Sequence, residues 1–429
     1  MELSKQLLSQ EFDIDLKVLD TVKAAENQVK DYFSRLDDIT AYNQYKVLAA
    51  FQKNRISDRH FAWNTGYGYD DPGREAIEKV FSDTFHTEAS LVRTQIVNGT
   101  HALSITLLGI LRPGEKLIYC SGGPYDTLEE VIGIRGENMG SLKDYGIDYD
   151  QVELLPNGKI DVDKVLQSIT PDTKVVAVQR ATGYGWRKSI SIEDIKIWAK
   201  AVHEKFPDVV TMVDNCYGEF LDIKEPTDVG VDVMAGSLIK NPGGGLALSG
   251  GYVTGKQELI DKIAYRLTCP GIGGECGLTF GQTRQMLQGF FMAPKVVNGA
   301  VKGAILCGQV YKNLGFEVCP EPDDLRSDII QAVKLNSEKA LVAFCQGIQS
   351  ASPIDSYVKP MPWDMPGYDS KVVMAAGAFV QGSSIELSAD GPARPPYNVY
   401  FQGGLTYEAS KIGVIKSLDK LYKEGIVNL

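Results

Sequence analysis

Short apolar runs alternate with amphipathic stretches along the middle of the chain. A short apolar run between turn residues predicts a buried strand, and apolar positions at helical spacing predict a helix. The strands expected on this basis are 90–97, 116–120, 174–179, 209–214, 231–238 and 251–254, and the helices are 74–81, 102–111 and 191–205. This alternation predicts a parallel sheet covered on both faces, which binds ligands beyond the carboxyl ends of its strands.

The two ends of the chain follow other patterns. Residues 22–51 have the apolar spacing of helices. After Pro294 the chain is expected to cross to a second domain, which contains runs at 316–319 and 371–379 and a helix at 406–422. The predicted organisation is an N-terminal helical arm, a large domain and a small C-terminal domain, with the boundaries 1–60, 61–295 and 296–429.

Composition narrows the class of protein. Hydrophobic residues make up 44% of the chain and charged residues 23%, an ordinary globular mixture, and the net charge is −11. An acidic protein is not expected to bind nucleic acid or anionic membranes. The seven cysteines form no CxxC pair, the N-terminus lacks the pattern of a signal peptide, and no apolar run suggests a membrane span, so a cytoplasmic location is expected. Four histidines without metal-ligand spacing predict no metal site.

A lysine and an aspartate each stand at the end of an apolar run. A lysine such as Lys240 is ordinarily solvated, but an amine removed from water is neutral and nucleophilic and can form a Schiff base. Asp214 could simply cap the next helix, or its carboxylate could keep a pyridine nitrogen protonated. The two positions are 26 residues apart (240 − 214 = 26), which suits neighbouring strands that end at one edge.

A glycine turn opens the helix after the first predicted strand, at Asn98, Gly99, Thr100 and His101. The amides at a helix N-terminus and their partial positive charge favour a phosphate. The hydroxyl groups of Thr100 and Ser237 could add two more contacts. The alternative is an ordinary capped helix start.

Three further side chains complete the expected site. Tyr125 follows a Gly-Gly-Pro turn and could stack on a flat ring, although packing within the loop is the alternative. Gln179 and Arg180 end another predicted strand and are expected to line the same edge. Together with Lys240 and Asp214, these residues predict a binding site for pyridoxal 5′-phosphate (PLP).

Five segments carry a resemblance to a known family. They are GYGYDDPGR (66–74), VNGTHA (97–102), VDNCYGE (213–219), SLIKN (237–241) and ELSADGPAR (386–394). The chain resembles fold type I PLP enzymes of the cystathionine lyase and methionine gamma-lyase group, and in particular a bacterial branch called aluminium-resistance proteins. The resemblance implies an α/β, PLP transferase-like fold, with a mixed, mostly parallel seven-stranded sheet in the large domain and a smaller C-terminal α+β domain.

The resemblance also implies roles for individual residues. Lys240 would hold the cofactor and Asp214 would face its pyridine nitrogen, while the phosphate contacts would come from Gly99, Thr100 and Ser237. In the family a tyrosine and an arginine reach the phosphate of a neighbouring subunit. Tyr67 or Tyr69 could supply that tyrosine here, but no arginine stands at the equivalent place. Arg394 is the residue expected to bind the substrate carboxylate, because a guanidinium matches a carboxylate with two hydrogen bonds.

The function implied is a PLP-dependent carbon–sulfur lyase acting on a sulfur-containing amino acid, with Tyr67, Tyr69 or Tyr125 protonating the leaving thiolate. The alternatives are another PLP reaction (aminotransfer, aldol cleavage or desulfuration), PLP binding without turnover, or nucleotide binding. Gly250 to Gln257 has the glycine and lysine spacing of a phosphate-binding loop, but a glutamine stands where such loops need serine or threonine. A homo-oligomer with its active site at the subunit interface is expected, and the sequence leaves dimer or homotetramer open.

Overall fold

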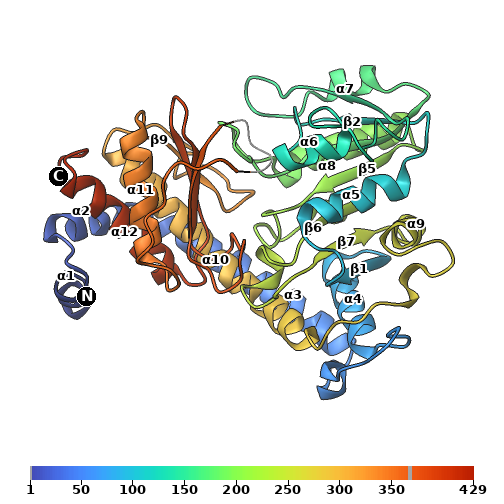
Figure 1. The fold of residues 1–429 in the computed structure, drawn as a ribbon, viewed down its shortest axis with the longest axis horizontal. Helices are drawn as coiled ribbons and strands as arrows, with labels where there is room; N and C mark the ends of the chain where they lie inside the picture. Colours follow the sequence, from blue (N-terminus) through green and yellow to red (C-terminus); the bar gives the residue numbers. More distant parts are fainter. Residues whose placement is uncertain (1, 366–369) are drawn as a thin grey trace. The chain divides into compact units, whose positions relative to one another are not determined.

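The computed structural model describes residues 2–365 and 370–429 and contains two compact units (Figure 1). The large unit comprises 41–183 and 189–294, and the small unit comprises 1–40, 184–188 and 295–429. Helices α3 (Lys30–Lys53) and α10 (Thr283–Asn313) each contribute residues to both units. The chain changes unit after residues 40 and 294, where the sequence suggested boundaries at 60 and 295.

The large unit is built on a seven-stranded sheet with the order β1-β7-β6-β5-β4-β2-β3. Its strands are β1 (Ala89–Arg93), β2 (Lys116–Tyr119), β3 (Asp148–Gln151), β4 (Thr173–Gln179), β5 (Val210–Asp214), β6 (Val233–Ser237) and β7 (Gly251–Gly255). The pairs from β6 to β3 are parallel, and β7 is antiparallel to both of its neighbours. The mixed, mostly parallel seven-stranded sheet is therefore confirmed.

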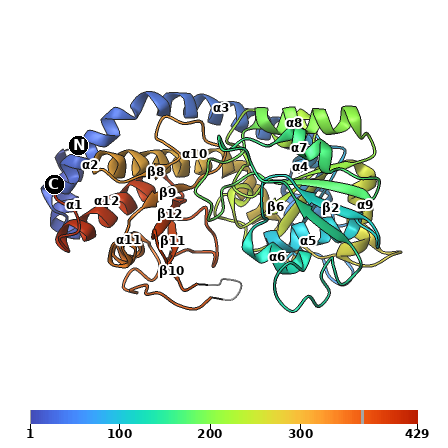
Figure 2. The ribbon, with the colours of Figure 1, turned by 90° about the horizontal axis from the view of Figure 1, so that it is seen from above.

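Helices cover both faces of this sheet. They are α4 (Pro72–Phe85), α5 (Gly99–Ile110), α6 (Asp126–Ile132), α7 (Val162–Ser168), α8 (Ile192–Lys205) and α9 (Gln257–Leu267), with short 3-10 helices η1 (Asp58–Phe61), η2 (Pro226–Val229), η3 (Asn241–Gly243) and η4 (Gly273–Glu275). Successive strand residues point to opposite faces, so Val175 and Ala177 join a core with α5 and α9, while Val176 and Val178 join a core with α4 and α8. Figure 2 shows α7 and α8 on the side of the strands opposite to α5.

The parallel strands end in register at one edge. Gln179 at the end of β4 pairs with Asp214 at the end of β5, and β6 ends at Ser237. Strand β1 is shorter than expected, since it ends at Arg93 where its antiparallel partner β7 begins at Gly251. The sheet thus places Gln179, Asp214 and Ser237 at its carboxyl edge, where a parallel α/β sheet binds ligands.

The small unit has its own core around an antiparallel sheet with the order β10-β11-β12-β9-β8. Its strands are β8 (Val318–Cys319), β9 (Gln331–Lys334), β10 (Val372–Ala376), β11 (Ser388–Pro392) and β12 (Asn398–Gln402), and its other helices are α1 (Glu2–Phe12), α2 (Leu16–Gln28), α11 (Glu338–Ala351) and α12 (Tyr407–Lys423). Helices α11 and α12 pack against each other, and α12 also contacts α2. The second, smaller C-terminal sheet is that of the expected α+β domain.

Helix α10 is long and apolar enough to cross a membrane by length and composition. The sequence predicts no apolar run of that length. In the structure, 83% of the apolar window of α10 is buried inside the protein, because Met286, Leu287 and Phe290 join the core of the large unit and Leu306 and Val310 join that of the small unit. This burial is typical of a core helix in a globular protein.

Gly243, in η3 just after Lys240, has no room for a side chain. A methyl group there would lie 1.7 Å from the carbonyl oxygen of Leu238 and 2.8 Å from Cβ of Ala247. Gly243→Ala is therefore expected to lower the thermal unfolding midpoint, with a cost of about 2–4 kcal/mol. Gly123→Ala is the matched control, because its nearest atom would be 3.8 Å away. Equal melting of the two variants would contradict this packing.

Candidate active site

The N-terminus of α5 lies against the ends of β5 and β6. Asn98 caps the helix, since its side chain accepts a hydrogen bond from the amide of His101 at 2.8 Å. A methyl group on Gly99 would lie 3.1 Å from Sγ of Cys216 and 3.4 Å from Cβ of Ser237. A glycine therefore allows the first turn of α5 to approach these residues closely.

Four polar side chains lie at this helix start. The Oγ atom of Ser237 is buried and has no hydrogen-bond partner among the residues that the structure describes. Oγ1 of Thr100 and Oγ1 of Thr127 are 2.7 Å apart. Nδ1 of His101 accepts a hydrogen bond from the amide of Val97 at 3.1 Å, and burial lowers the pKa of His101, which favours a neutral ring. The unpaired hydroxyl of Ser237 beside a helix N-terminus suits a phosphate group.

Lys240 lies three residues beyond β6, in the turn before η3. Its Nζ is 4.2 Å from the ring centroid of Tyr217. Burial lowers the pKa of Lys240, whereas interactions with the acidic groups of Cys216, Tyr217, Asp214 and Glu219 raise it, and the overall direction is upward. Asp214 and Glu219 thus oppose the effect of burial on the amine, and a neutral Lys240 remains a prediction.

Asp214 is buried at the end of β5, and its Oδ1 accepts a hydrogen bond from the amide of Cys216 at 3.0 Å. Burial raises the pKa of Asp214, and the positive charge of Lys240 lowers it in part. The two side chains thus influence each other electrostatically, as expected for residues that serve one site.

Tyr125 and Gln179 lie together at the same edge. A methyl group on Gly183 would lie 3.1 Å from Nε2 of Gln179 and 3.3 Å from Cδ2 of Tyr125. Tyr125 is half-buried immediately before α6, the helix that contains Thr127. Since Thr127 contacts Thr100, the tyrosine belongs to the same neighbourhood as the start of α5.

These residues fit PLP on three independent points. Lys240 supplies an amine, Asp214 supplies a buried carboxyl group for a pyridinium nitrogen, and the unpaired hydroxyl of Ser237 adjoins a helix N-terminus. No group of three or more metal-ligating side chains was found among residues 2–365 and 370–429.

Other predicted residues lie elsewhere. Tyr67 and Tyr69 are on an exposed loop of the large unit, with exposed fractions of 72% and 59% and ring centroids 5.5 Å apart. Arg394 is exposed in the turn between β11 and β12 of the small unit. Arg180, which was expected to line the edge, is instead fully buried, and its Nη1 donates to the carbonyl oxygen of Gly218 at 2.7 Å.

Residues in the loop after β5 also belong to this site and were not predicted from the sequence. Tyr217 faces Lys240, and Glu219 is fully buried and interacts electrostatically with that lysine. Asn241, next to Lys240, donates from Nδ2 to the carbonyl oxygen of Glu219 at 3.1 Å. Their position directly after a strand that ends in Asp214 is the one sequence signal that could have pointed to them.

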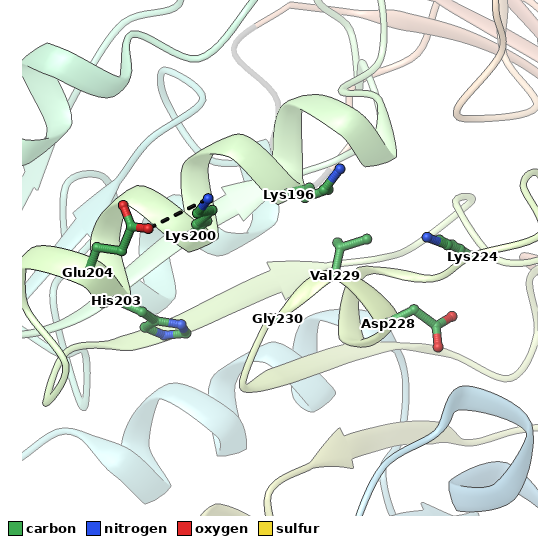
Figure 3. Close-up of a pocket in the computed structure, with 8 residues that line it drawn as sticks. All are labelled: Lys196, Lys200, His203, Glu204, Lys224, Asp228, Val229 and Gly230. Atoms are coloured by element: carbon green, nitrogen blue, oxygen red, sulfur yellow. Dashed lines mark ion pairs between the residues drawn. The ribbon is translucent and has the colours of Figure 1, made fainter.

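A surface cleft in the large unit, separate from the residues around Lys240, is lined mainly by charged side chains (Figure 3). It is lined by Lys196, Lys200, His203, Glu204, Lys224, Asp228, Val229 and Gly230. Most of its charges are already paired, for example Lys200 with Glu204 at 3.6 Å and His203 with Asp232 at 3.0 Å. The cleft contains none of the residues gathered around Lys240.

Comparison with known proteins identifies the family. The model of the methionine gamma-lyase family matches residues 18–422. The uncharacterized protein YnbB of Bacillus subtilis (strain 168) is 49% identical over 408 residues, which cover 95% of this chain and 97% of that protein. The structure of a carbon–sulfur lyase involved in aluminium resistance from Clostridium novyi NT is 51% identical, with a TM-score of 0.94 over 98% of this chain and 99% of that one.

More distant structures support the fold alone. Cystathionine gamma-lyase from Lactobacillus plantarum is 16% identical, with a TM-score of 0.58 over 83% of this chain and 87% of that one. These findings confirm the resemblance inferred from the sequence. The chain therefore belongs to the methionine gamma-lyase family, a family of carbon–sulfur lyases.

Proposed function

We propose that this protein is a PLP-dependent carbon–sulfur lyase that eliminates a thiol from a sulfur-containing amino acid, as cystathionine beta-lyases and methionine gamma-lyases do. The observation that carries the proposal is the arrangement at the carboxyl edge of the sheet. There Lys240 and Asp214 influence each other electrostatically, and the buried, unpaired hydroxyl of Ser237 adjoins the start of α5. Family membership supports the same chemistry.

The residues that would hold the cofactor follow from this arrangement. Lys240 would attach it covalently, Asp214 would face the pyridine nitrogen, and Tyr125 and Gln179 would lie beside the ring. The phosphate would take hydrogen bonds at the start of α5, from the segment Asn98, Gly99, Thr100 and His101 together with Ser237. PLP, when bound, supplies a protonated ring that accepts electrons from a carbanion.

The chain itself would bind the amino acid and move protons. Arg394 would bind the substrate carboxylate with two hydrogen bonds, and Tyr69 would contribute to substrate binding. Nζ of Lys240, once released by the incoming amino group, would take the proton from the substrate Cα and return it later. Tyr125 or Tyr67 would donate a proton to the leaving sulfur.

We also infer a homo-oligomer whose active site lies at the subunit interface. Tyr67 and Tyr69 are strongly exposed in the single chain, as is Trp63 at 67%. The ring of Trp63 lies against the backbone of Gly281, where an added methyl group would be 2.6 Å from Cε3. Exposed aromatic side chains that cluster are typical of interfaces between chains. A cytoplasmic setting, without nucleic acid or membrane as partner, completes the proposal.

A substrate panel tests the reaction. Purified protein supplied with PLP is expected to release a keto acid, ammonia and a thiol from at least one of L-cystathionine, L-methionine and L-cysteine. The assay measures keto acid and free thiol together. Keto acid that depends on an added keto-acid acceptor, without thiol release, would indicate aminotransfer and contradict the lyase. Absence of both products with fully bound cofactor would support binding without turnover.

A further inference from the structure

Glu219 lies in a constrained loop that follows Asp214 at the end of β5. The residues on either side of the Gly218–Glu219 pair, Tyr217 and Phe220, both have left-handed backbones, with φ of 69° and 66°. Such conformations cost energy for residues with a side chain and persist only where the surroundings enforce them. The loop is held by Arg180, whose Nη1 donates to the carbonyl oxygen of Gly218 at 2.7 Å.

The carboxyl group of Glu219 is fully buried and half satisfied. The hydroxyl of Tyr252, on β7, donates to its Oε1 at 2.6 Å. The other oxygen, Oε2, is buried without a hydrogen-bond partner among the described residues. A methyl group on Gly236 would lie 2.7 Å from Oε1, so the carboxyl group packs against the backbone of β6 just before Ser237. An acid in this position can hold a proton on its unpaired oxygen or carry an uncompensated charge.

Glu219 is also coupled to Lys240. Its carbonyl oxygen accepts a hydrogen bond from Nδ2 of the buried Asn241 at 3.1 Å, and Asn241 follows the lysine directly. Its carboxylate is one of the acidic groups whose charge favours the ammonium form of Lys240. The mechanism described above gives Glu219 no role.

We propose that Glu219 is a positioning residue that sets the charge of the Lys240 amine, by holding a proton in one pH range and a negative charge in the next. The inference deepens the proposed function, because it concerns the lysine that would attach the cofactor. The titratable or charged groups that act on Glu219 or share its surroundings are Tyr252 from β7, Arg180 after β4, Glu225 before η2, Lys240 before η3, and Asp214, Cys216 and Tyr217 on its own segment.

The expected pH dependence follows from the environment. Burial raises the pKa of Glu219 to about 8, against the opposing effect of the hydrogen bond from Tyr252. At pH 6 the side chain is neutral, and at pH 9 it carries a negative charge that opposes loss of the proton from Lys240. Glu219→Gln is neutral at both pH values, so it should differ from the wild type only at the higher pH.

The experiment measures the reactivity of the Lys240 amine. Full-length protein is treated with hydroxylamine and dialysed, so that no aldehyde blocks the lysine, and is then reductively methylated at pH 6 and pH 9. Mass spectrometry gives the rate at Lys240 relative to Lys200, an exposed lysine of the same unit with a side chain 70% exposed. In Glu219→Gln this ratio should match the wild type at pH 6 and exceed it about 3- to 10-fold at pH 9.

Tyr252→Phe provides an independent test that keeps the aromatic packing. Loss of the hydroxyl donor should raise the pKa of Glu219 further, so the relative rate at Lys240 should rise at pH 9 and stay unchanged at pH 6. Ratios equal to the wild type at pH 9, in either folded variant, would overturn the inference. An equal increase at both pH values would indicate loosened packing and would overturn it as well. Because methylation needs no cofactor, failure here is distinguishable from failure of the proposed lyase.

Discussion

Replacement of Lys240 by alanine should lower kcat for keto-acid release by at least about 1,000-fold, the largest effect we expect from a single change. The variant loses both the amine that attaches the cofactor and the group that moves the substrate proton. Steady-state release of keto acid from the substrate identified in the panel measures the effect. A Lys240→Ala variant within tenfold of the wild type would exclude Lys240 as the cofactor lysine.

Two variants separate this role from loss of charge. Lys240→Arg keeps a positive charge near Asp214 and Glu219, but a guanidinium remains protonated and cannot act as the nucleophile. It should therefore be as inactive as the alanine variant. Lys200→Ala removes an exposed lysine in the cleft of Figure 3 and should leave kcat unchanged.

Replacement of Asp214 by asparagine should lower kcat about 100-fold or more, because a neutral amide cannot hold the pyridine nitrogen protonated. The asparagine keeps an oxygen that can accept the hydrogen bond from the amide of Cys216. That bond is 3.0 Å long in the wild type. Kinetics of the loaded enzyme measure the loss. Asp208→Asn, an exposed position before β5, is the matched control and should retain full activity.

Stability distinguishes this loss from unfolding. Burial raises the pKa of Asp214, so its ionised form is less favourable in the folded protein than in the unfolded chain. Without cofactor, the variant with a neutral amide should therefore melt no lower than the wild type. An Asp214→Asn variant with near wild-type kcat, or one whose unfolding midpoint is lowered in the cofactor-free protein, would contradict the assigned role.

The placement of Gln179 and Asp214 at one edge of the sheet could be predicted from the sequence. Gln179 and Asp214 are polar residues that directly end buried apolar runs, and parallel strands bring such ends together. The exposed strand β3 could not be predicted in this way, because Asp148–Gln151 is polar and only partly covered. The end of β1 could not be predicted either. It is set by the start of its antiparallel partner β7, which lies in another part of the chain.

The buried polar contacts of Arg180, Glu219 and Tyr252 could not be predicted, because the bonded groups are distant in sequence. Arg180 bonds to a carbonyl 38 residues away, and Tyr252 bonds to Glu219 across 33 residues. No periodicity marks such buried polar pairs, which depend on how the strands are ordered.

Borohydride trapping tests the central claim most directly. The wild-type protein, supplied with PLP, is reduced with borohydride, digested and analysed by mass spectrometry. The account predicts loss of the visible absorbance band and a single phosphopyridoxyl-modified peptide, with the modification on Lys240. A protein that shows no visible band with added PLP, or one modified at another lysine, would contradict it.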